Sequence, residues 1–257
     1  MAPLIFLDGS LIPMSMNRIP TVTKNLLAIN ALMFLAALVF EQRGIDLGSL
    51  LGLHYFASSN FYPFQLVTYM FMHGNFAHLF FNMFALYMFG RTLEYVWGAK
   101  RFLIFYVVAG IGAGLVQEAI GVARYFSVVS EMDPVAVDIV LNEGAAVLGE
   151  GLNYAMPSMA ELNYIVNAQT VGASGAIYAI LLGFGMLFPN ERMFIFPVPF
   201  PIKAKFFVIG YAVIELFLGV SGTADGIAHF AHLGGMLFGF LLIVYWRGKR
   251  KIGGPYV

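Results

Sequence analysis

Apolar residues gather in six long runs along the chain, and the segments between them collect most of the polar and charged residues. A helix that crosses a bilayer needs about 20 mostly apolar residues, so the pattern predicts an all-α membrane protein with six spanning helices. Three of the runs are short, which favours helices packed in a bundle over isolated anchors. The predicted spans are about 25–40, 66–89, 102–122, 171–188, 205–220 and 227–246.

The composition points to the same class of protein. Of the 257 residues, 60% are hydrophobic and 11% are charged, whereas about a quarter of the residues in a soluble domain are charged. The chain has no cysteine, which excludes disulfides and thiolate chemistry. Its first ten residues resemble neither a secretory signal peptide nor a mitochondrial transit segment, so we expect no cleaved leader of either kind.

Basic residues divide unevenly between the two sides of the predicted bundle. If the spans alternate in direction, 12 of the 14 Lys and Arg residues fall on one side, and only Arg43 and Arg124 fall on the other. The positive-inside rule then places both termini in the cytoplasm, which requires an even number of spans. We accordingly expect a cytoplasmic tail over 1–24, a membrane domain over 25–246 and a basic cytoplasmic tail over 247–257.

The third loop, at about 124–167, is enlarged and acidic, and we predict that it is external. Asp133 followed by Pro134 is typical of a helix N-cap and first helical position. Ser158 with Glu161 has the spacing of a capping box. The loop is therefore expected to hold two short helices, and a simple packed cover and a functional lid both stay open as explanations.

Polar side chains at membrane depth are costly and need a reason. Ser174 is about three residues into the fourth predicted span and His232 about five residues into the sixth, so at 1.5 Å per residue both lie within roughly 10 Å of the outer boundary. A serine and a histidine at one depth are a nucleophile and a base by type. His78 and Asn82 lie somewhat deeper in the second span, on one helical face.

Each of these features also has a bland explanation when it is taken alone. The small residues around Ser174 could simply let helices approach closely, and Asn82 or His78 could be polar contacts between helices. A pair such as His229 and His232 is more often a satisfied pair, or a set of metal or haem ligands, than a catalytic base. Only their combination favours catalysis.

Taken together, three segments resemble the motifs of the rhomboid intramembrane proteases. The resemblance covers about 64–246, and the segments lie in the family's order on the second, fourth and sixth predicted spans. They are His73-Gly74-Asn75-Phe76-Ala77-His78-Leu79-Phe80-Phe81-Asn82, Gly172-Ala173-Ser174-Gly175-Ala176-Ile177-Tyr178, and Ala231-His232-Leu233-Gly234-Gly235-Met236-Leu237-Phe238-Gly239.

The resemblance implies a serine endopeptidase with a Ser–His dyad and no third carboxylate. Ser174 would be the nucleophile and His232 the general base. His78 and Asn82, joined by the backbone N–H of Ser174, would stabilise the oxyanion of the tetrahedral intermediate.

The same resemblance assigns supporting roles to other residues. Tyr178 would pack against the base, and Gly172 would keep a side chain from crowding the site. His73 and His229 would help to line a hydrated pocket, because a peptide bond cannot be hydrolysed where water is absent. Glu94 matches a structural acid at the end of the second span.

The family also implies substrates that are single-span membrane proteins, cut near the outer end of their helix. We expect contact with the lipid bilayer, no cofactor, no metal and no nucleic-acid partner. The expected location is a bacterial cytoplasmic membrane, with the active site open to the external face. Two departures concern access to the site: the first external loop reads Tyr62-Pro63-Phe64-Gln65 where the family often has a Trp-Arg pair, and the third loop is longer than in the minimal family form.

Two other functions stay open. A catalytically silent rhomboid-like protein would bind membrane helices without cutting them, although this chain has both Ser174 and His232. A multi-histidine haem or metal protein would use His73, His78, His229 and His232 as ligands. That alternative is weakened because we expect no acid in the cluster, with only Asp225 nearby. Glu118 and Glu215, within the third and fifth spans, are expected to face the bundle and have no assigned role.

Overall fold

The computed structural model describes residues 4–7, 10–13, 18–194, 200–221 and 228–248, and these are mostly helical. The elements in chain order are β1 (Leu4–Leu7), β2 (Ser10–Pro13), α1 (Thr21–Glu41), α2 (Leu47–Leu51), α3 (Gln65–Thr68), η1 (Tyr69–Phe71), α4 (Phe76–Ala85), η2 (Leu86–Gly90), α5 (Arg91–Trp97), α6 (Ala99–Val129), α7 (Pro134–Gly149), α8 (Pro157–Asn167), α9 (Ser174–Leu187), β3 (Arg192–Met193), β4 (Ile202–Lys203), α10 (Ala204–Ser221) and α11 (His229–Gly248).

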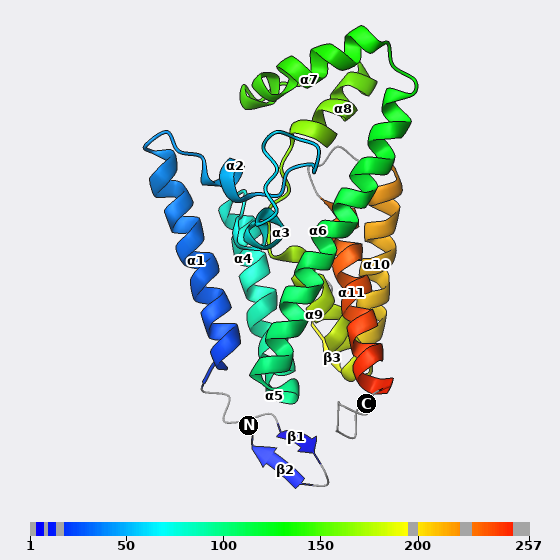
Figure 1. Ribbon diagram of the computed structural model, residues 1–257. Helices are drawn as coiled ribbons and strands as arrows, with labels where there is room; N and C mark the ends of the chain where they lie inside the picture. Colours follow the sequence, from blue (N-terminus) through cyan, green and yellow to red (C-terminus); the bar gives the residue numbers. More distant parts are fainter. Residues whose placement is uncertain (1–3, 8–9, 14–17, 195–199, 222–227, 249–257) are drawn as a thin grey trace.

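Long apolar helices form the body of the molecule and stand side by side (Figure 1). Among the described residues, α1, α6, α10 and α11 are long and apolar enough to cross a membrane. Helix α9 is shorter, and α4, the π-helical segment η2 and α5 follow one another without a break. The start of α1 and the end of α11 lie at the same end of the bundle.

The structure corrects the predicted start of the second span. Residues from 65 to 71 form the short elements α3 and η1 instead of the beginning of a long helix. Helix α4 begins at Phe76 because the Asn75 side chain caps it, accepting a hydrogen bond from the backbone N–H of His78 at 2.8 Å. His73 therefore precedes the helix.

Small residues let the central helices approach closely. Helices α6, α9 and α11 make the most extensive contacts of the bundle. A Cβ atom added to Gly235 on α11 would lie 1.9 Å from the carbonyl oxygen of Gly175 on α9, and one added to Gly239 would lie 2.8 Å from the Cβ of Ala179. The two backbones are thus in direct contact, as in other membrane bundles in which small residues line the interface.

Large apolar side chains cover the outside of the bundle. Leu35 on α1, Phe81 on α4 and Phe217 on α10 are among many that are exposed. A surface of this kind fits hydrocarbon and not water.

The acid predicted to be structural at the end of the second span caps another helix. Buried Glu94 on α5 accepts hydrogen bonds from the backbone N–H groups of Val22 at 2.9 Å and Thr23 at 2.7 Å, and so caps the start of α1.

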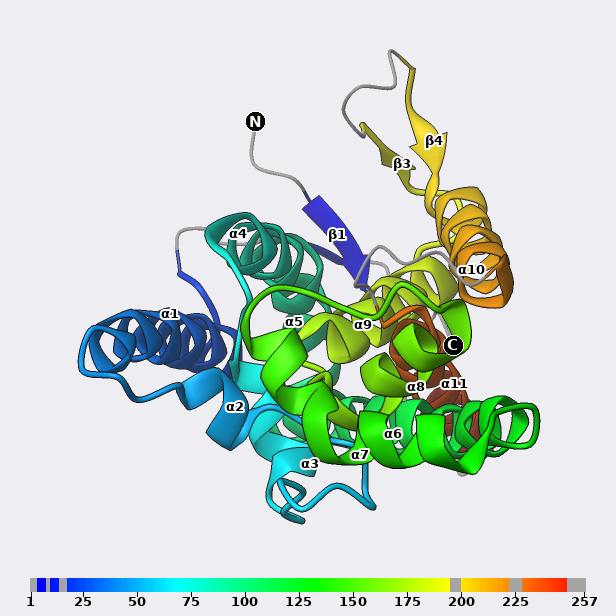
Figure 2. The ribbon, with the colours of Figure 1, turned by 90° about the horizontal axis from the view of Figure 1, so that it is seen from above.

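Helices α7 and α8 form a layer over one end of the bundle, as both views show (Figures 1 and 2). They are the two short helices predicted for the third loop, although α6 continues beyond the predicted end of its span, to Val129. The Asp133 side chain caps α7 by accepting from the N–H of Val135 at 2.8 Å, as predicted.

The capping box predicted at the start of α8 is wrong. Pro157 is the first residue of α8 and Met156 is its N-cap residue, so Ser158 lies inside the helix and cannot cap it. Glu161 binds Arg124 of α6 instead, through contacts of 2.8 and 3.0 Å.

Candidate active site

Ser174 and His232 lie next to each other although 58 residues separate them in the chain. Ser174 is the first residue of α9, and His232 lies in the first turn of α11. The Nε2 atom of His232 is 2.8 Å from the Oγ atom of Ser174. This distance allows the imidazole to accept the hydroxyl proton, which is the geometry of an activated serine.

Tyr178 lies one helical turn after Ser174 and holds the imidazole of His232. The two rings are stacked, with centroids 4.2 Å apart and an angle of 7° between their planes. The stacking limits rotation of the His232 ring, and it places Tyr178 against the base, where the sequence predicted it.

The segment before Ser174 is fixed from two sides. Leu53 and Thr170 form a β-bridge with backbone hydrogen bonds of 2.9 and 2.8 Å. The N–H of Gly172 donates to the carbonyl oxygen of Tyr69 at 2.9 Å. These bonds anchor the entry to α9 to the first loop and to η1, so the position of Ser174 does not depend on α8 alone.

Gly172 is required by both its backbone and its surroundings. Its φ of +129° is a conformation that other residues rarely adopt. A Cβ atom there would lie 2.7 Å from Nε2 of His78 and 3.5 Å from Oγ of Ser174. The rings and hydroxyl of the site therefore border a space that only a glycine leaves open.

His78 of α4 borders this space, and Asn82 lies one helical turn after it. Asn82 is buried, and its Nδ2 atom has no hydrogen-bond partner among the described residues. A buried donor without a partner is costly, which makes Asn82 Nδ2 a candidate group for binding an oxygen atom. The ring of His73 lies beside that of His78, with centroids 5.0 Å apart, and the backbone N–H of Ser174 is at a helix N-terminus, where no intrahelical acceptor exists.

Glu215 on α10 is the functional candidate that the sequence analysis missed. Its Oε2 atom lies 2.6 Å from Nδ1 of His229 and 3.0 Å from Nδ1 of His232, and its Oε1 atom accepts a hydrogen bond from the Tyr178 hydroxyl. The expectation that the histidine cluster contains no acid is therefore wrong, while the expected burial of Glu215 is confirmed at 5% exposure.

Position along the helices offered a signal for this contact. Glu215 is six residues before the end of α10, and His232 is three residues after the start of α11. Because these two ends follow one another in the chain, both side chains lie at a similar depth. The axial depth that places Ser174 near His232 thus places Glu215 near His232 as well.

Glu215, His229 and His232 are also of the types that bind metal ions, with candidate ligand atoms within 4.8 Å of one another. Ligands bound to one zinc ion at about 2.0–2.1 Å in a tetrahedron lie about 3.3 Å apart. The 2.6 Å contact between Glu215 and His229 is shorter than that. The contacts in this cluster include a hydrogen bond between Glu215 and His229 and a 3.0 Å approach of Glu215 to Nδ1 of His232.

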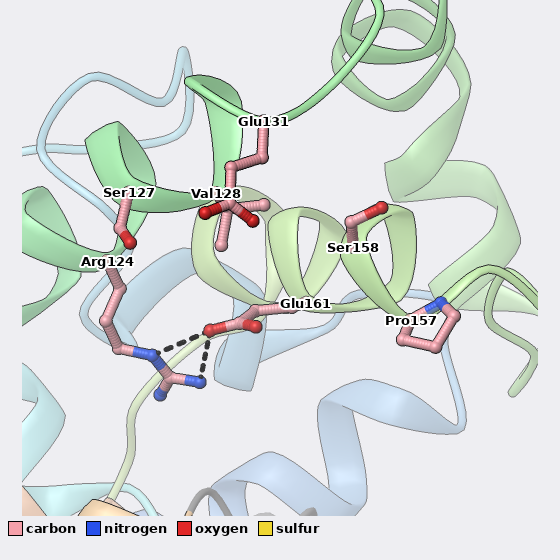
Figure 3. A pocket seen from close by; sticks show the side chains of 7 residues that line it. All are labelled: Arg124, Ser127, Val128, Glu131, Pro157, Ser158 and Glu161. Carbon is pink, nitrogen blue, oxygen red and sulfur yellow. Dashed lines mark hydrogen bonds and ion pairs between the residues drawn. The ribbon is translucent and has the colours of Figure 1, made fainter.

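A separate hollow of about 280 Å³ lies between α6 and α8, and neither Ser174 nor His232 lines it (Figure 3). Arg124 and Glu161 point toward each other across it, and their side chains are 45% and 39% exposed. An exposed pair of this kind contributes little to stability. None of the residues that line the hollow is a histidine, so we assign the chemistry to the Ser174–His232 site.

Comparison with known families matches residues 60–249 to the Rhomboid domain. The protein belongs to the rhomboid family, which the three sequence motifs indicated. An uncharacterized mitochondrial rhomboid protein of Schizosaccharomyces pombe is 29% identical over 204 residues, which cover 72% of this chain and 52% of that protein.

Two further relatives have similar identity. Rhomboid protein 1, mitochondrial, of Saccharomyces cerevisiae is 27% identical over 180 residues, with 66% of this chain and 38% of the relative covered. Rhomboid-like protein 11, chloroplastic, of Arabidopsis thaliana is 27% identical over 231 residues, with coverage of 85% and 62%. The chain thus spans less than two thirds of the length of each of these relatives.

The relatives do not support the predicted bacterial location. Their names place them in mitochondria and chloroplasts. The apolar helices indicate an integral membrane protein, and the particular membrane stays a prediction.

Proposed function

We propose that this protein is an intramembrane serine endopeptidase that hydrolyses peptide bonds in or near transmembrane segments of other membrane proteins. The observation that carries the proposal is the 2.8 Å distance between Oγ of Ser174 and Nε2 of His232. Membership of the rhomboid family supports it, because that family consists mostly of serine proteases.

In the proposed reaction, His232 accepts the Ser174 proton as the hydroxyl oxygen attacks the scissile carbonyl carbon. His232 then donates this proton to the leaving amine, and an acyl-enzyme remains. A water molecule, deprotonated by His232, attacks the acyl-enzyme and releases the second product. The oxyanion of each tetrahedral intermediate would accept hydrogen bonds from His78, Asn82 and the backbone N–H of Ser174, and each such donor typically contributes ~3 kcal/mol.

The proposed substrates are single-span membrane proteins. A helix hides its carbonyl groups in hydrogen bonds from residue i to residue i−4, so the segment must unwind before Ser174 can attack it. Helix-breaking Gly or Pro residues near the cleavage site would make this easier.

The proposed topology has six spans, formed by α1, α4 to α5, α6, α9, α10 and α11, with both termini in the cytoplasm and the active site near the external face. Because the chain has no cysteine, single cysteines can report on it without background. In sealed right-side-out vesicles, an impermeant maleimide should label Leu152→Cys, between α7 and α8, but not Lys100→Cys, in the first turn of α6. The reverse labelling pattern would contradict the proposed orientation.

The decisive experiment compares the purified protein with Ser174→Ala and a matched control. A fluorophosphonate probe should label the original protein and the control Ser221→Ala, which removes a hydroxyl that bonds back to the carbonyl oxygens of Phe217 and Leu218. It should not label Ser174→Ala, and this variant and His232→Ala should not cleave a reconstituted single-span substrate while remaining folded. Cleavage by Ser174→Ala would refute the dyad.

The same experiment tests the second candidate, a rhomboid-like protein that binds membrane helices without cutting them. In that case the original protein would capture the substrate helix but would neither react with the probe nor release a cleavage product.

A further inference from the structure

We propose that Glu215 is a positioning residue for the base, so that the dyad works as a Ser174–His232–Glu215 triad. The inference rests on the proposed protease function and deepens it. Its basis is a continuous path of short contacts: Glu215 Oε2 is 3.0 Å from His232 Nδ1, and His232 Nε2 is 2.8 Å from Ser174 Oγ.

The carboxylate sets the tautomer of the imidazole. A neutral histidine carries its proton on one ring nitrogen, and its partner there decides which one. An acid beside Nδ1 favours the proton on Nδ1, which leaves the lone pair of Nε2 directed at the serine. When His232 takes the serine proton, the same carboxylate stabilises the imidazolium ion, as in serine-protease triads in which an acid orients the base.

The carboxylate is itself held in place. Nδ1 of His229 lies 2.6 Å from Oε2, and the hydroxyl of Tyr178 donates to Oε1. Tyr178 also stacks on the ring of His232, so one residue restrains both the base and its acid. The 3.0 Å contact with His232 lacks the alignment of a good hydrogen bond, because Oε2 is shared with His229. A small rotation of the Glu215 or His232 side chain when a substrate binds would improve the alignment of this contact.

A purely structural role is the alternative. Only Ala204, Val208 and Glu215 of α10 are buried, so the acid could serve only to attach α10 to its neighbours. That role predicts a loss of stability and no specific change in chemistry. The groups that face Glu215 and titrate near it are His229 and His232 on α11 and Tyr178 on α9, with Tyr211 of α10 next to Tyr178.

The test compares Glu215→Gln and Glu215→Asp with Glu118→Gln. Glu118 is a matched control because it is a half-buried acid in α6, and it accepts a hydrogen bond from the N–H of Phe56, outside the site. For each variant, kcat, KM, the pH profile of kcat/KM and the melting temperature are measured on one detergent preparation with one membrane substrate.

We expect Glu215→Gln to lower kcat about 10²–10⁴-fold, because a side-chain amide can donate to Nδ1 and favour the wrong tautomer. KM and the melting temperature should change little. Glu215→Asp should recover part of the lost kcat, and Glu118→Gln should keep normal kcat.

Three results would overturn the inference. The first is a kcat of Glu215→Gln within threefold of normal, and the second is a loss of activity that only follows a lower melting temperature. The third is stoichiometric metal bound to the purified protein and lost in Glu215→Gln, which would make the acid a metal ligand. If Ser174→Ala is inactive in the same assay, each of these results rejects the triad and leaves the protease proposal standing.

Discussion

Helices α10 and α11 follow one another in the chain and are similar in length and apolar character, yet they occupy opposite environments. In the most apolar stretch of α10, 17% of the residues are buried inside the protein, whereas 50% of the residues in the corresponding stretch of α11 are buried. Helix α11 packs against α6 and α9 through Gly234, Gly235 and Gly239. Helix α10 directs large side chains such as Phe217 outward.

The comparison shows that an apolar sequence places a helix in the membrane but does not determine whether it lies at the centre or at the outside of the bundle. Lipid tails are as apolar as leucine, so burial between helices depends on small residues that allow close packing and on polar residues that need partners. Helix α11 has both kinds in abundance. Helix α10 has one buried acid, Glu215, which contacts His229 and His232 of the site.

The largest effect should come from truncating a side chain inside the central helices. Phe105 of α6 has no exposed surface and packs against Trp97 and Trp246. We expect Phe105→Ala to lower the free energy of unfolding by about 3–5 kcal/mol, as measured by denaturation in mixed micelles. A change below about 1 kcal/mol would mean that the central helices are not packed more tightly than α10.

The next largest effect should come from removing a hydrogen-bond donor at the candidate active site. Asn82→Ala and His78→Ala should each lower turnover about 10²–10³-fold through the loss of an oxyanion donor, while Ser174 still reacts with small electrophiles. Asn30→Ala is the control, since Asn30 is buried in α1 and donates to the carbonyl oxygen of Leu26 at 2.8 Å. Activity that falls only together with the melting temperature would show that Asn82 and His78 are structural contacts.

A single added methyl group should have different effects in α11 and in α10. Gly235→Ala places a Cβ against the backbone of Gly175, and overpacking of this kind costs about 1–3 kcal/mol. Cleavage activity should fall with it, because Ser174 and His232 lie on the helices that are pushed apart. Gly210→Ala in α10 has no atom within 4 Å of the new methyl group and should leave both quantities unchanged or improve stability slightly. Equal effects of the two substitutions would remove the distinction.

The smallest effect is expected on the outer face of α10. Phe217 is 69% exposed, so lipid would contact its ring in the folded and unfolded states alike and would fill the space left by a smaller side chain. Phe217→Ala should therefore change the free energy of unfolding by less than about 0.5 kcal/mol, with normal turnover in lipid vesicles. A large loss of stability would show that this face is covered by protein.

Sequence reasoning predicted the features that depend on apolar run length, helix signals and axial depth. These include the long helices, the Asp133 cap and the proximity of Ser174 to His232. It failed where local chemistry overrides apolarity: residues 66–71 are apolar, but the Asn75 cap starts α4 only after them. It also missed the contact of Glu215 with His232, because an apolar run does not reveal which side of α10 faces α11.

The bridge between Leu53 and Thr170 has a consequence for how this fold can diversify. It fixes the chain immediately before Ser174 to a loop that precedes α4. Helices α7 and α8 lie between Leu53 and Thr170 in the chain, so a change in their length would leave this anchor of Ser174 in place. The layer formed by α7 and α8 can therefore vary in sequence and length independently of the geometry around Ser174.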